Sequence, residues 1–264
     1  MNDSVRINSI LENIIAAERE AAGLILEAHG VMAEAKTSRR DVVTEYDRRV
    51  QVLLVQRLSE AVPNARFFCE EQEKKDDIHA EQLFVIDPID GTMNFVRGFH
   101  HSCISIAYAE KGELKAAAIY NPYVDELFTA TLGGGAFLNG KPIHADDAPL
   151  KETLVCFGSS PYDMQLADRC FELVEKAFAA SLDVRREGSA ALDLCSAASG
   201  RAGVYFELAL SPWDYAAGTL LVREAGGVCF TAEGKEIRLT ASRPSIVAGG
   251  KAAVEEFLRL ANEP

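Results

Sequence analysis

From residue 65 onward, the apolar residues of this chain fall into short runs that are bounded by polar residues. Segments 65–69 and 83–87 are the first of these runs, and the same texture repeats at hairpin spacing over residues 102–138. Runs of this length are typical of buried strands and are shorter than most helices. We therefore predict that buried strands form the centre of the fold.

Helical periodicity begins the chain. Apolar residues recur every three or four positions over residues 7–29 and again over 50–61, where Pro63 stops the pattern. This spacing predicts two amphipathic helices. Thr44, followed three residues later by Asp47, resembles the N-terminal cap of the second helix.

A polar segment at residues 144–152 separates a region of consecutive strand-like runs from a region of a different pattern. After it, strand-like and helix-like segments alternate to the C-terminus, the last helix covering residues 251–261. This organisation predicts an α+β protein. We expect two lobes, residues 1–148 and 149–264, that share one cleft and act as a single catalytic unit.

The charge balance restricts the partners. The chain has 27 Lys and Arg residues against 40 Asp and Glu residues, a net charge of −13. Such a surface disfavours nucleic acid and anionic membrane, both of which attract clustered cations. Binding an anionic substrate would require a local reversal of this field, which a metal ion can provide.

Two further observations concern the compartment. The six cysteines are widely spread without a C-x-x-C pair, and no signal peptide or apolar run of membrane-spanning length is recognisable. Isolated thiols in apolar segments usually pack as small hydrophobic groups. We expect a protein of the reducing cytoplasm.

The segment FVIDPIDGTMNF, residues 84–95, is the most informative in the chain. An apolar strand delivers Asp87 and Asp90 at its C-terminal end, where α/β layers place ligands. Pro88 restricts the backbone between them, and Gly91 allows the main chain to approach an oxyanion. A helix starting at Thr92 would add N–H donors for phosphate. Asp-Pro and Asp-Gly are also ordinary turn dipeptides, so the segment alone leaves a simple turn open.

Acidic residues stand at two other element ends. Glu70 and Glu71 follow a strand, and Asp214 opens a helix after the strand at 203–206. Each alone is also explained as a solvated charge or as a helix-capping acid. Three such ends with oxygen ligands, and no competing His or Cys cluster, favour a hard cation such as Mg²⁺.

Two segments resemble binding motifs of other kinds, and we expect neither to be a binding site. Residues 135–142 read G-x-x-x-x-G-K-P, in which Pro142 replaces the Ser or Thr of a P-loop, and we expect a hairpin there. His100, His101 and Cys103 could suggest zinc, but neighbouring residues of a strand point to opposite faces. We expect these side chains to have a capping role or to be partly buried, and not to bind a metal.

Taken together, these residues resemble the inositol monophosphatase family. The resemblance runs from about residue 5 to residue 250. Its motifs are Lys36, VVTEYD (42–47), EE (70–71), DPIDGTMNF (87–95), GSAALDL (188–194) and WDYAAGTLLVREAGG (213–227). It implies a layered αβαβα sandwich of the inositol monophosphatase and fructose-1,6-bisphosphatase type. It also implies a lithium-sensitive homodimer that uses two or three Mg²⁺ ions.

The resemblance further implies roles for single residues. The metal ligands would be Glu70, Asp87, the main-chain carbonyl of Ile89, Asp90 and Asp214. Thr92 and Glu70 would orient and activate the attacking water, and Asp47 would hold Thr92 or a water on the metal. The substrate would contact Lys36, Gly91, Thr92, Gly188, Ser189, Ala190, Glu207 and Asp214. Within this set, the N–H groups of Gly91 and Thr92 would hold phosphate oxygens, and Glu207 would accept hydroxyl hydrogen bonds.

The expected activity is hydrolysis of inositol monophosphate or a similar small polyol or sugar phosphate. Relatives also act on fructose 1,6-bisphosphate, NADP(H) or 3′-phosphoadenosine phosphate, but this chain has no long insertion that could build an adenine pocket. Another class stays open, a regulatory protein-binding module, because some bacterial relatives associate with the transcription machinery. Tyr46, Cys69 and Glu187 depart from residues that are common in the family.

Overall fold

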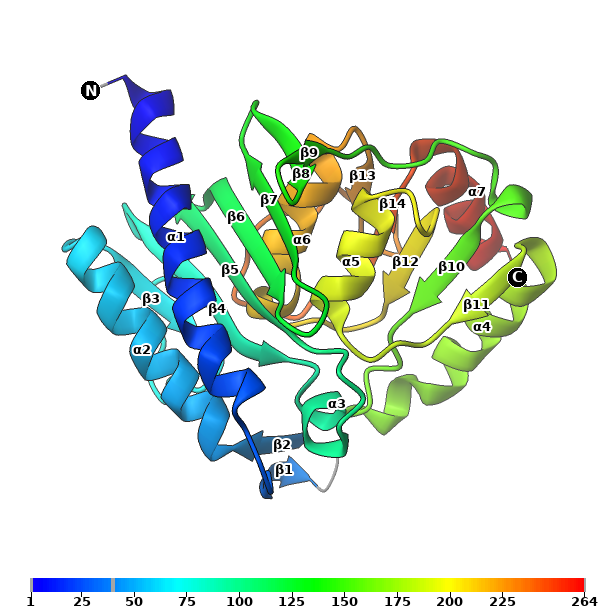
Figure 1. The fold of residues 1–264 in the computed structure, drawn as a ribbon. Helices are drawn as coiled ribbons and strands as arrows, with labels where there is room; N and C mark the ends of the chain where they lie inside the picture. The colour runs from blue at the N-terminus through cyan, green and yellow to red at the C-terminus, as the bar shows by residue number, and fades with distance from the viewer. Residues whose placement is uncertain (1, 39–40, 264) are drawn as a thin grey trace.

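A computed structural model describes residues 2–38 and 41–263 of the chain. The backbone forms five layers, in which helices and sheets alternate in the order αβαβα (Figure 1). The layered α+β sandwich expected from the sequence is therefore confirmed.

The first layer consists of α1 (Asp3–Leu26) and α2 (Glu45–Ala61). Their apolar faces pack on one face of the larger sheet, as the helical periodicity predicts. Thr44 caps α2: its hydroxyl accepts from the Asp47 N–H, while Asp47 accepts from the Thr44 N–H. The capping box expected from the sequence is confirmed.

A short hairpin precedes α2 and was not predicted. It consists of β1 (Ala33–Ser38) and β2 (Asp41–Thr44), paired antiparallel. The segment has few apolar residues and no alternation that would indicate a strand, so the sequence pattern does not predict these two strands or their register. The hairpin lies beside α3 at the lower edge of the molecule in Figure 1.

The second layer is a sheet of seven strands in sequence order, antiparallel except for the parallel first pair. Its strands are β3 (Arg66–Cys69), β4 (Leu83–Asp90), β5 (Cys103–Glu110), β6 (Glu113–Asn121), β7 (Glu126–Thr131), β8 (Gly135–Leu138) and β9 (Lys141–Pro142). Along β4, Phe84 and Ile86 face α1 and α2, whereas Leu83 and Val85 face the middle helices. The hairpin β8–β9 occupies the P-loop-like segment, as expected.

The middle layer is a pair of helices, α5 (Ala190–Ala198) and α6 (Pro212–Glu224). They pack closely because Gly218 of α6 faces Leu194 of α5, where an added Cβ would lie 2.5 Å from the leucine side chain. Apolar residues of both sheets and both helices form one continuous core. The two halves of the chain are thus joined through this layer.

The last two layers are a sheet of five strands and an outer helical layer. The sheet has the order β11–β10–β12–β14–β13, and α4 (Ala167–Ala180) and α7 (Lys251–Asn262) cover its outer face. The strand bounds are β10 Leu154–Phe157, β11 Asp183–Arg185, β12 Val204–Glu207, β13 Val228–Phe230 and β14 Ile246–Gly249; short 3₁₀ helices cover Leu150–Glu152 and Met164–Leu166. Among the helices described here, none has both the length and the apolar character needed to cross a bilayer.

Candidate functional site

Asp87 and Asp90 lie where β4 ends and α3 (Thr92–Arg97) begins. Asp87 Oδ1 accepts a hydrogen bond of 3.1 Å from the N–H of Ile89, which fixes this carboxylate against its own turn. Asp90 Oδ2 accepts from the Ser189 hydroxyl at 2.6 Å and from the Ala191 N–H at 2.8 Å. The strand end of the first half of the chain is thereby tied to the N-terminus of α5 in the second half.

The other two acidic element ends converge on the same place. Asp214 lies in the first turn of α6, where its Oδ2 accepts from the Ser211 N–H at 2.7 Å. One carboxylate oxygen of each of Asp87, Asp90 and Asp214 lies within 4.8 Å of the others. Glu70 follows β3, which pairs with β4, and it lines the same cleft.

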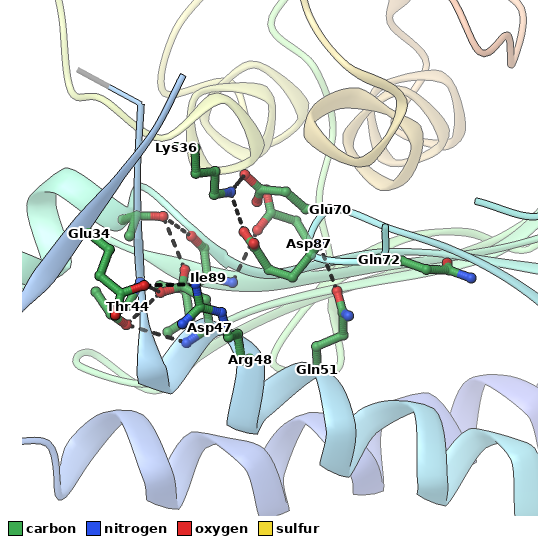
Figure 2. Close-up of polar contacts among 12 residues, drawn as sticks. Glu34, Lys36, Thr44, Asp47, Arg48, Gln51, Glu70, Gln72, Asp87 and Ile89 are labelled. Atoms are coloured by element: carbon green, nitrogen blue, oxygen red, sulfur yellow. Dashed lines mark hydrogen bonds and ion pairs between the residues drawn. The ribbon is translucent and has the colours of Figure 1, made fainter. Parts of the chain in front are cut away.

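Lys36 of the β1–β2 hairpin reaches into this acidic group (Figure 2). Its Nζ lies 2.8 Å from Glu70 Oε1 and also forms an ion pair with Glu71. Burial lowers the pKa of Lys36, but Glu70 and Glu71 more than reverse this effect, so the net pKa is raised. Lys36 therefore stays cationic and offsets part of the negative charge.

The remaining charge is poorly compensated by the protein itself. Burial raises the pKa of Asp87 and of Asp214, and neighbouring carboxylates raise both further. Burial also raises the pKa of Asp90 to about 6, although hydrogen bonds from Ser189 and Ala191 oppose the shift. Buried carboxylates that repel one another favour a bound cation or a proton.

Thr92 connects the acidic group to α2. Its hydroxyl lies 3.2 Å from Asp47 Oδ1 and 3.0 Å from the carbonyl oxygen of Ile89. Asp47 is fully buried and already accepts from the Thr44 N–H and hydroxyl through its other oxygen. Burial raises the pKa of Asp47, with the hydrogen bonds from Thr44 acting in the opposite direction.

Gly91 is required by the shape of this turn. Its φ is +83°, and an added Cβ would lie 3.0 Å from the His101 carbonyl oxygen and 3.3 Å from that of Gly188. A side chain would therefore be strained by both the backbone conformation and the close approach. This glycine lets the turn between β4 and α3 approach the backbone at His101 and at Gly188 beside the acidic group.

The donor set fits a divalent cation. Carboxylate and carbonyl oxygens are the ligands that Mg²⁺ prefers, and the side chains of Asp87, Asp90 and Asp214 supply three within one small volume. The described residues hold no His or Cys group of comparable geometry. The carbonyl of Ile89 is adjacent, since Thr92 bonds to it.

These residues line a cleft of about 530 Å³. Its predicted members are Lys36, Glu70, Asp87, Ile89, Asp90, Gly91, Thr92, Gly188 and Asp214. Asp47, Ser189, Ala190 and Glu207 are outside the described lining. Glu207 is buried, and its oxygens accept from the Ser160 N–H at 2.7 Å and from the Tyr205 hydroxyl at 2.8 Å.

The cleft also has members that the sequence reasoning did not assign. They are Met93, Asn94, Pro161, Tyr162, Arg186, Ser211, Trp213 and Arg243. Asn94 and Trp213 lie inside the recognised motifs, and Arg186 lies two residues before one. Their position in the sequence, close to motif residues, could therefore have predicted that they line the cleft. Arg243 has no such neighbour.

Lys75 supports the edge of the cleft from outside. Its Nζ donates to the carbonyls of Glu70 at 3.4 Å and Gln72 at 3.0 Å, and it lies 4.8 Å from the ring centre of Trp213. Burial lowers the pKa of Lys75. This cation links the loop that carries Glu70 to the helix that carries Asp214.

The zinc-like group His100, His101 and Cys103 does not form a cluster. His100 stacks on Tyr123, with ring centres 4.8 Å apart, and His101 lies 3.4 Å from Glu187. Cys103 is buried, and all six cysteines are free and buried. His100 is exposed, His101 is half-buried and Cys103 is fully buried, so the expected partial burial holds for His101 alone of these three residues.

Comparison with known proteins shows the family to which this fold belongs. The model of the inositol monophosphatase family matches residues 7–263. The chain therefore belongs to the inositol monophosphatase family.

Individual relatives narrow the comparison. The Nus factor SuhB of Escherichia coli K12 is 36% identical over 258 residues, covering 96% of this chain and 95% of that protein. The crystal structure of the extragenic suppressor protein suhB from Bartonella henselae superposes with a TM-score of 0.89 at 30% identity, covering 96% and 98%. A staphylococcal inositol monophosphatase-1, solved as an inhibitory complex soaked in 100 mM LiCl, has a TM-score of 0.86 at 27% identity, covering 97% and 95%.

Proposed function

We propose that this protein is a Mg²⁺-dependent phosphomonoester hydrolase that acts on inositol monophosphate or a similar small polyol or sugar phosphate. One observation carries the proposal: acidic side chains from three separate element ends meet in one cleft, with three carboxylate oxygens within 4.8 Å of one another. The membership of the family supports it.

We assign the metal ligands to Glu70, Asp87, the Ile89 carbonyl, Asp90 and Asp214. Two or three bound Mg²⁺ ions would neutralise the phosphoryl group and acidify the attacking water. Three of these ligands are held by hydrogen bonds before any ion binds. Asp87 is held by the Ile89 N–H, Asp90 by Ser189 and Ala191, and Asp214 by the Ser211 N–H.

Thr92, Glu70 and Asp47 would handle the attacking water. The Thr92 hydroxyl donates toward Asp47 or Ile89, which leaves its oxygen lone pairs available to accept a hydrogen bond from a water. Asp47 fixes the orientation of Thr92 from α2. Glu70 would accept a hydrogen bond from the other hydrogen of the same water after its ion pair with Lys36 loosens, so that the two side chains orient the water for attack.

The substrate would extend from this end across the cleft. The N–H groups of Gly91 and Thr92 would donate to phosphate oxygens, and Lys36 would add a positive charge. Gly188, which lines the cleft, would contact the polyol, and Asp214 would contact it beside the metal. Ser189 and Ala190, which do not line the cleft, would act on the substrate only by holding this turn and Asp90 in place. Glu207 would accept hydroxyl hydrogen bonds once Ser160 releases one of its oxygens.

A pair of variants tests the activity. In Asp90→Asn, a neutral amide replaces a ligand of nearly the same shape, so phosphate release from inositol 1-phosphate in millimolar Mg²⁺ should fall by at least about 100-fold. Glu175→Gln, which removes an exposed charge on α4, serves as the matched control. A wild-type protein that releases phosphate from no inositol, sugar or nucleotide monophosphate would refute the proposal.

A second candidate, a regulatory protein-binding module, is favoured by the name of one relative, since the SuhB of Escherichia coli is called a Nus factor. The two roles separate in an Escherichia coli strain that lacks SuhB. If Asp90→Asn restores growth as well as wild type does, binding is the function that matters. If only wild type restores growth, hydrolysis is required.

We also propose a cytoplasmic homodimer without direct contact to nucleic acid or membrane. Free cysteines suit a reducing compartment, and a net charge of −13 disfavours polyanions. Light scattering of the purified protein would give twice the chain mass of 28.7 kDa. A monomeric mass at micromolar concentration would contradict the dimer.

A further inference from the structure

Glu70 is the one acidic ligand of our assignment that lies outside the compact carboxylate group. That group consists of Asp87, Asp90 and Asp214, whose oxygens lie within 4.8 Å of one another, whereas Glu70 lines the cleft from the turn that follows β3. A metal ion shared by Glu70 and Asp214 therefore depends on how this turn is held against α6.

The N–H groups of this turn are bonded to the first half of the chain. The Glu70 N–H donates to the Ile86 carbonyl of β4 at 3.1 Å, and the Glu71 N–H donates to the Gln51 side chain of α2 at 2.9 Å. Lys36, which forms ion pairs with both glutamates, also comes from this half. None of these contacts reaches α6, which carries the ligand of the second half.

Lys75 joins the turn to α6. Its Nζ donates to the carbonyl oxygens of Gln72 at 3.0 Å and of Glu70 at 3.4 Å, and the same ammonium lies 4.8 Å from the ring centre of Trp213 in the first turn of α6. The ring of Phe68 in β3 lies 6.0 Å from this ammonium and 6.0 Å from the Trp213 ring. A cation is attracted to the face of an aromatic ring, most strongly to that of tryptophan. Lys75 is thus held by the backbone of the turn and by a side chain of the helix.

The ring that Lys75 contacts belongs to the same helical turn as a ligand, since Trp213 directly precedes Asp214. Lys75 is outside the lining of the cleft, and among the residues that the structure describes no carboxylate pairs with it. Its neighbour Lys74 is exposed, as is usual for a lysine, whose ammonium normally stays in water. Lys75 therefore contacts the elements that carry two ligands without lining the substrate cleft.

We propose that Lys75 is a positioning residue of the metal site, which fixes the turn that carries Glu70 against the start of α6, which carries Asp214. This inference rests on the proposed metal-dependent hydrolase and adds a residue outside its ligands and its substrate contacts. A ligand that is not already in place must be ordered when the ion binds, and that cost lowers the affinity. Loss of Lys75 should therefore weaken Mg²⁺ binding and change turnover at saturating Mg²⁺ much less.

Lys75→Met tests the proposal, because methionine keeps most of the apolar stem and removes the ammonium. Calorimetric titration of the substrate-free protein with Mg²⁺ should give a Kd about tenfold higher than that of wild type. The kcat for phosphate release at saturating Mg²⁺ should change less than about threefold. Lys75→Arg, which keeps the charge and can both donate to the same carbonyls and stack on the indole, should recover most of the affinity.

Lys74→Met is the matched control, since it removes the same charge from an exposed side chain one position away. It should leave the Kd for Mg²⁺ within about twofold of the wild-type value. The inference is overturned if Lys75→Met binds Mg²⁺ as tightly as wild type does. It is also overturned if Lys74→Met weakens binding to the same extent, or if Lys75→Arg recovers none of the loss.

Fluorescence gives a readout that a general loss of stability would not produce. Trp213 is the single tryptophan of the chain, so Lys75→Met should change the intensity or wavelength of its emission in the metal-free protein, whereas Lys74→Met should not. Unchanged emission in Lys75→Met would show that the contact is not made in solution and would overturn the inference. Urea unfolding checks that each variant is folded. If Lys75→Met does not fold, Lys75→Gln, which keeps N–H donors without the charge, takes its place and should show a smaller rise in Kd.

The titrations separate this inference from the proposed activity. If the wild type binds Mg²⁺ but hydrolyses no phosphomonoester, the hydrolase fails and the Kd values still decide the role of Lys75. If the wild type is active and Lys75→Met keeps the wild-type Kd, the activity stands and this inference fails. A wild type that binds no Mg²⁺ overturns both.

Discussion

Asp214→Asn should stabilise the metal-free protein and weaken its response to Mg²⁺. The change keeps the shape and an oxygen that can still accept from the Ser211 N–H, so the start of α6 is retained. It removes one of three charges whose oxygens lie within 4.8 Å of one another. At an effective dielectric constant of about 20, each such ionised pair repels by about 3.5 kcal/mol.

Protonation limits this cost. Because burial and the charges of Asp90 and Glu70 raise the pKa of Asp214 above its ordinary value of 3.8, the folded protein retains a proton that the unfolded chain releases. Stability therefore falls by up to about 1.4 kcal/mol per pH unit as the pH rises from the unfolded pKa toward the folded one. Asparagine removes this contribution, and we expect a gain of about 1–3 kcal/mol at pH 7 in EDTA.

Bound Mg²⁺ should stabilise the wild type more than Asp214→Asn. A ligand at 100 times its Kd stabilises the wild type by about 2.7 kcal/mol, whereas tenfold weaker binding leaves about 1.4 kcal/mol. Urea unfolding in EDTA and in Mg²⁺ measures both effects, with Glu175→Gln as the control. If Asp214→Asn destabilises the metal-free protein, the carboxylates are not crowded in solution. If its Mg²⁺ response equals that of wild type, Asp214 is not a ligand.

Three other predictions concern different parts of the molecule. Glu18 of α1 is fully buried and has no hydrogen-bond partner among the residues that the structure describes, and burial raises its pKa well above 4.5. Glu18→Leu should therefore raise stability at pH 7 by about 1–3 kcal/mol and reduce its fall between pH 5 and 7, measured by urea unfolding. Gly91→Ala should cost about 1–3 kcal/mol and lower phosphatase activity more than tenfold, because His101 and Gly188 must move. Lithium should inhibit phosphate release, as in the soaked staphylococcal relative; unchanged activity in 100 mM LiCl would contradict the metal assignment.

The spacing of apolar residues predicted the strands and helices whose apolar faces are set by the local sequence. The short apolar run at residues 83–87 predicted the buried strand β4, and helical spacing predicted the amphipathic helices α1 and α2, whose apolar faces pack on the sheet. The acidic element ends were predicted as a group because three such ends carry oxygen ligands and the sequence has no competing His or Cys cluster. That Asp87, Asp90 and Asp214 meet agrees with this expectation, although their role as ligands stays a prediction.

Features set by distant contacts were not accessible in this way. The β1–β2 hairpin has no apolar alternation, and only pairing shows it. The bonds from Ser189 and Ala191 to Asp90 join residues about one hundred positions apart, and no local motif announces them. Arg243 joins the cleft only because the loop before β14 folds beside Ala209.

The helical layer between the two sheets also governs how the chain is made. The larger sheet is complete at Pro142, but α6, which covers one of its faces, ends at Glu224, 82 residues later. At ribosomal rates of about 5–20 residues per second, that apolar face stays bare for roughly 4–16 s. During this interval, the nascent chain exposes a broad apolar surface that chaperones, or other nascent chains on the same mRNA, can bind. A fragment truncated near residue 148 would keep that surface permanently and should aggregate.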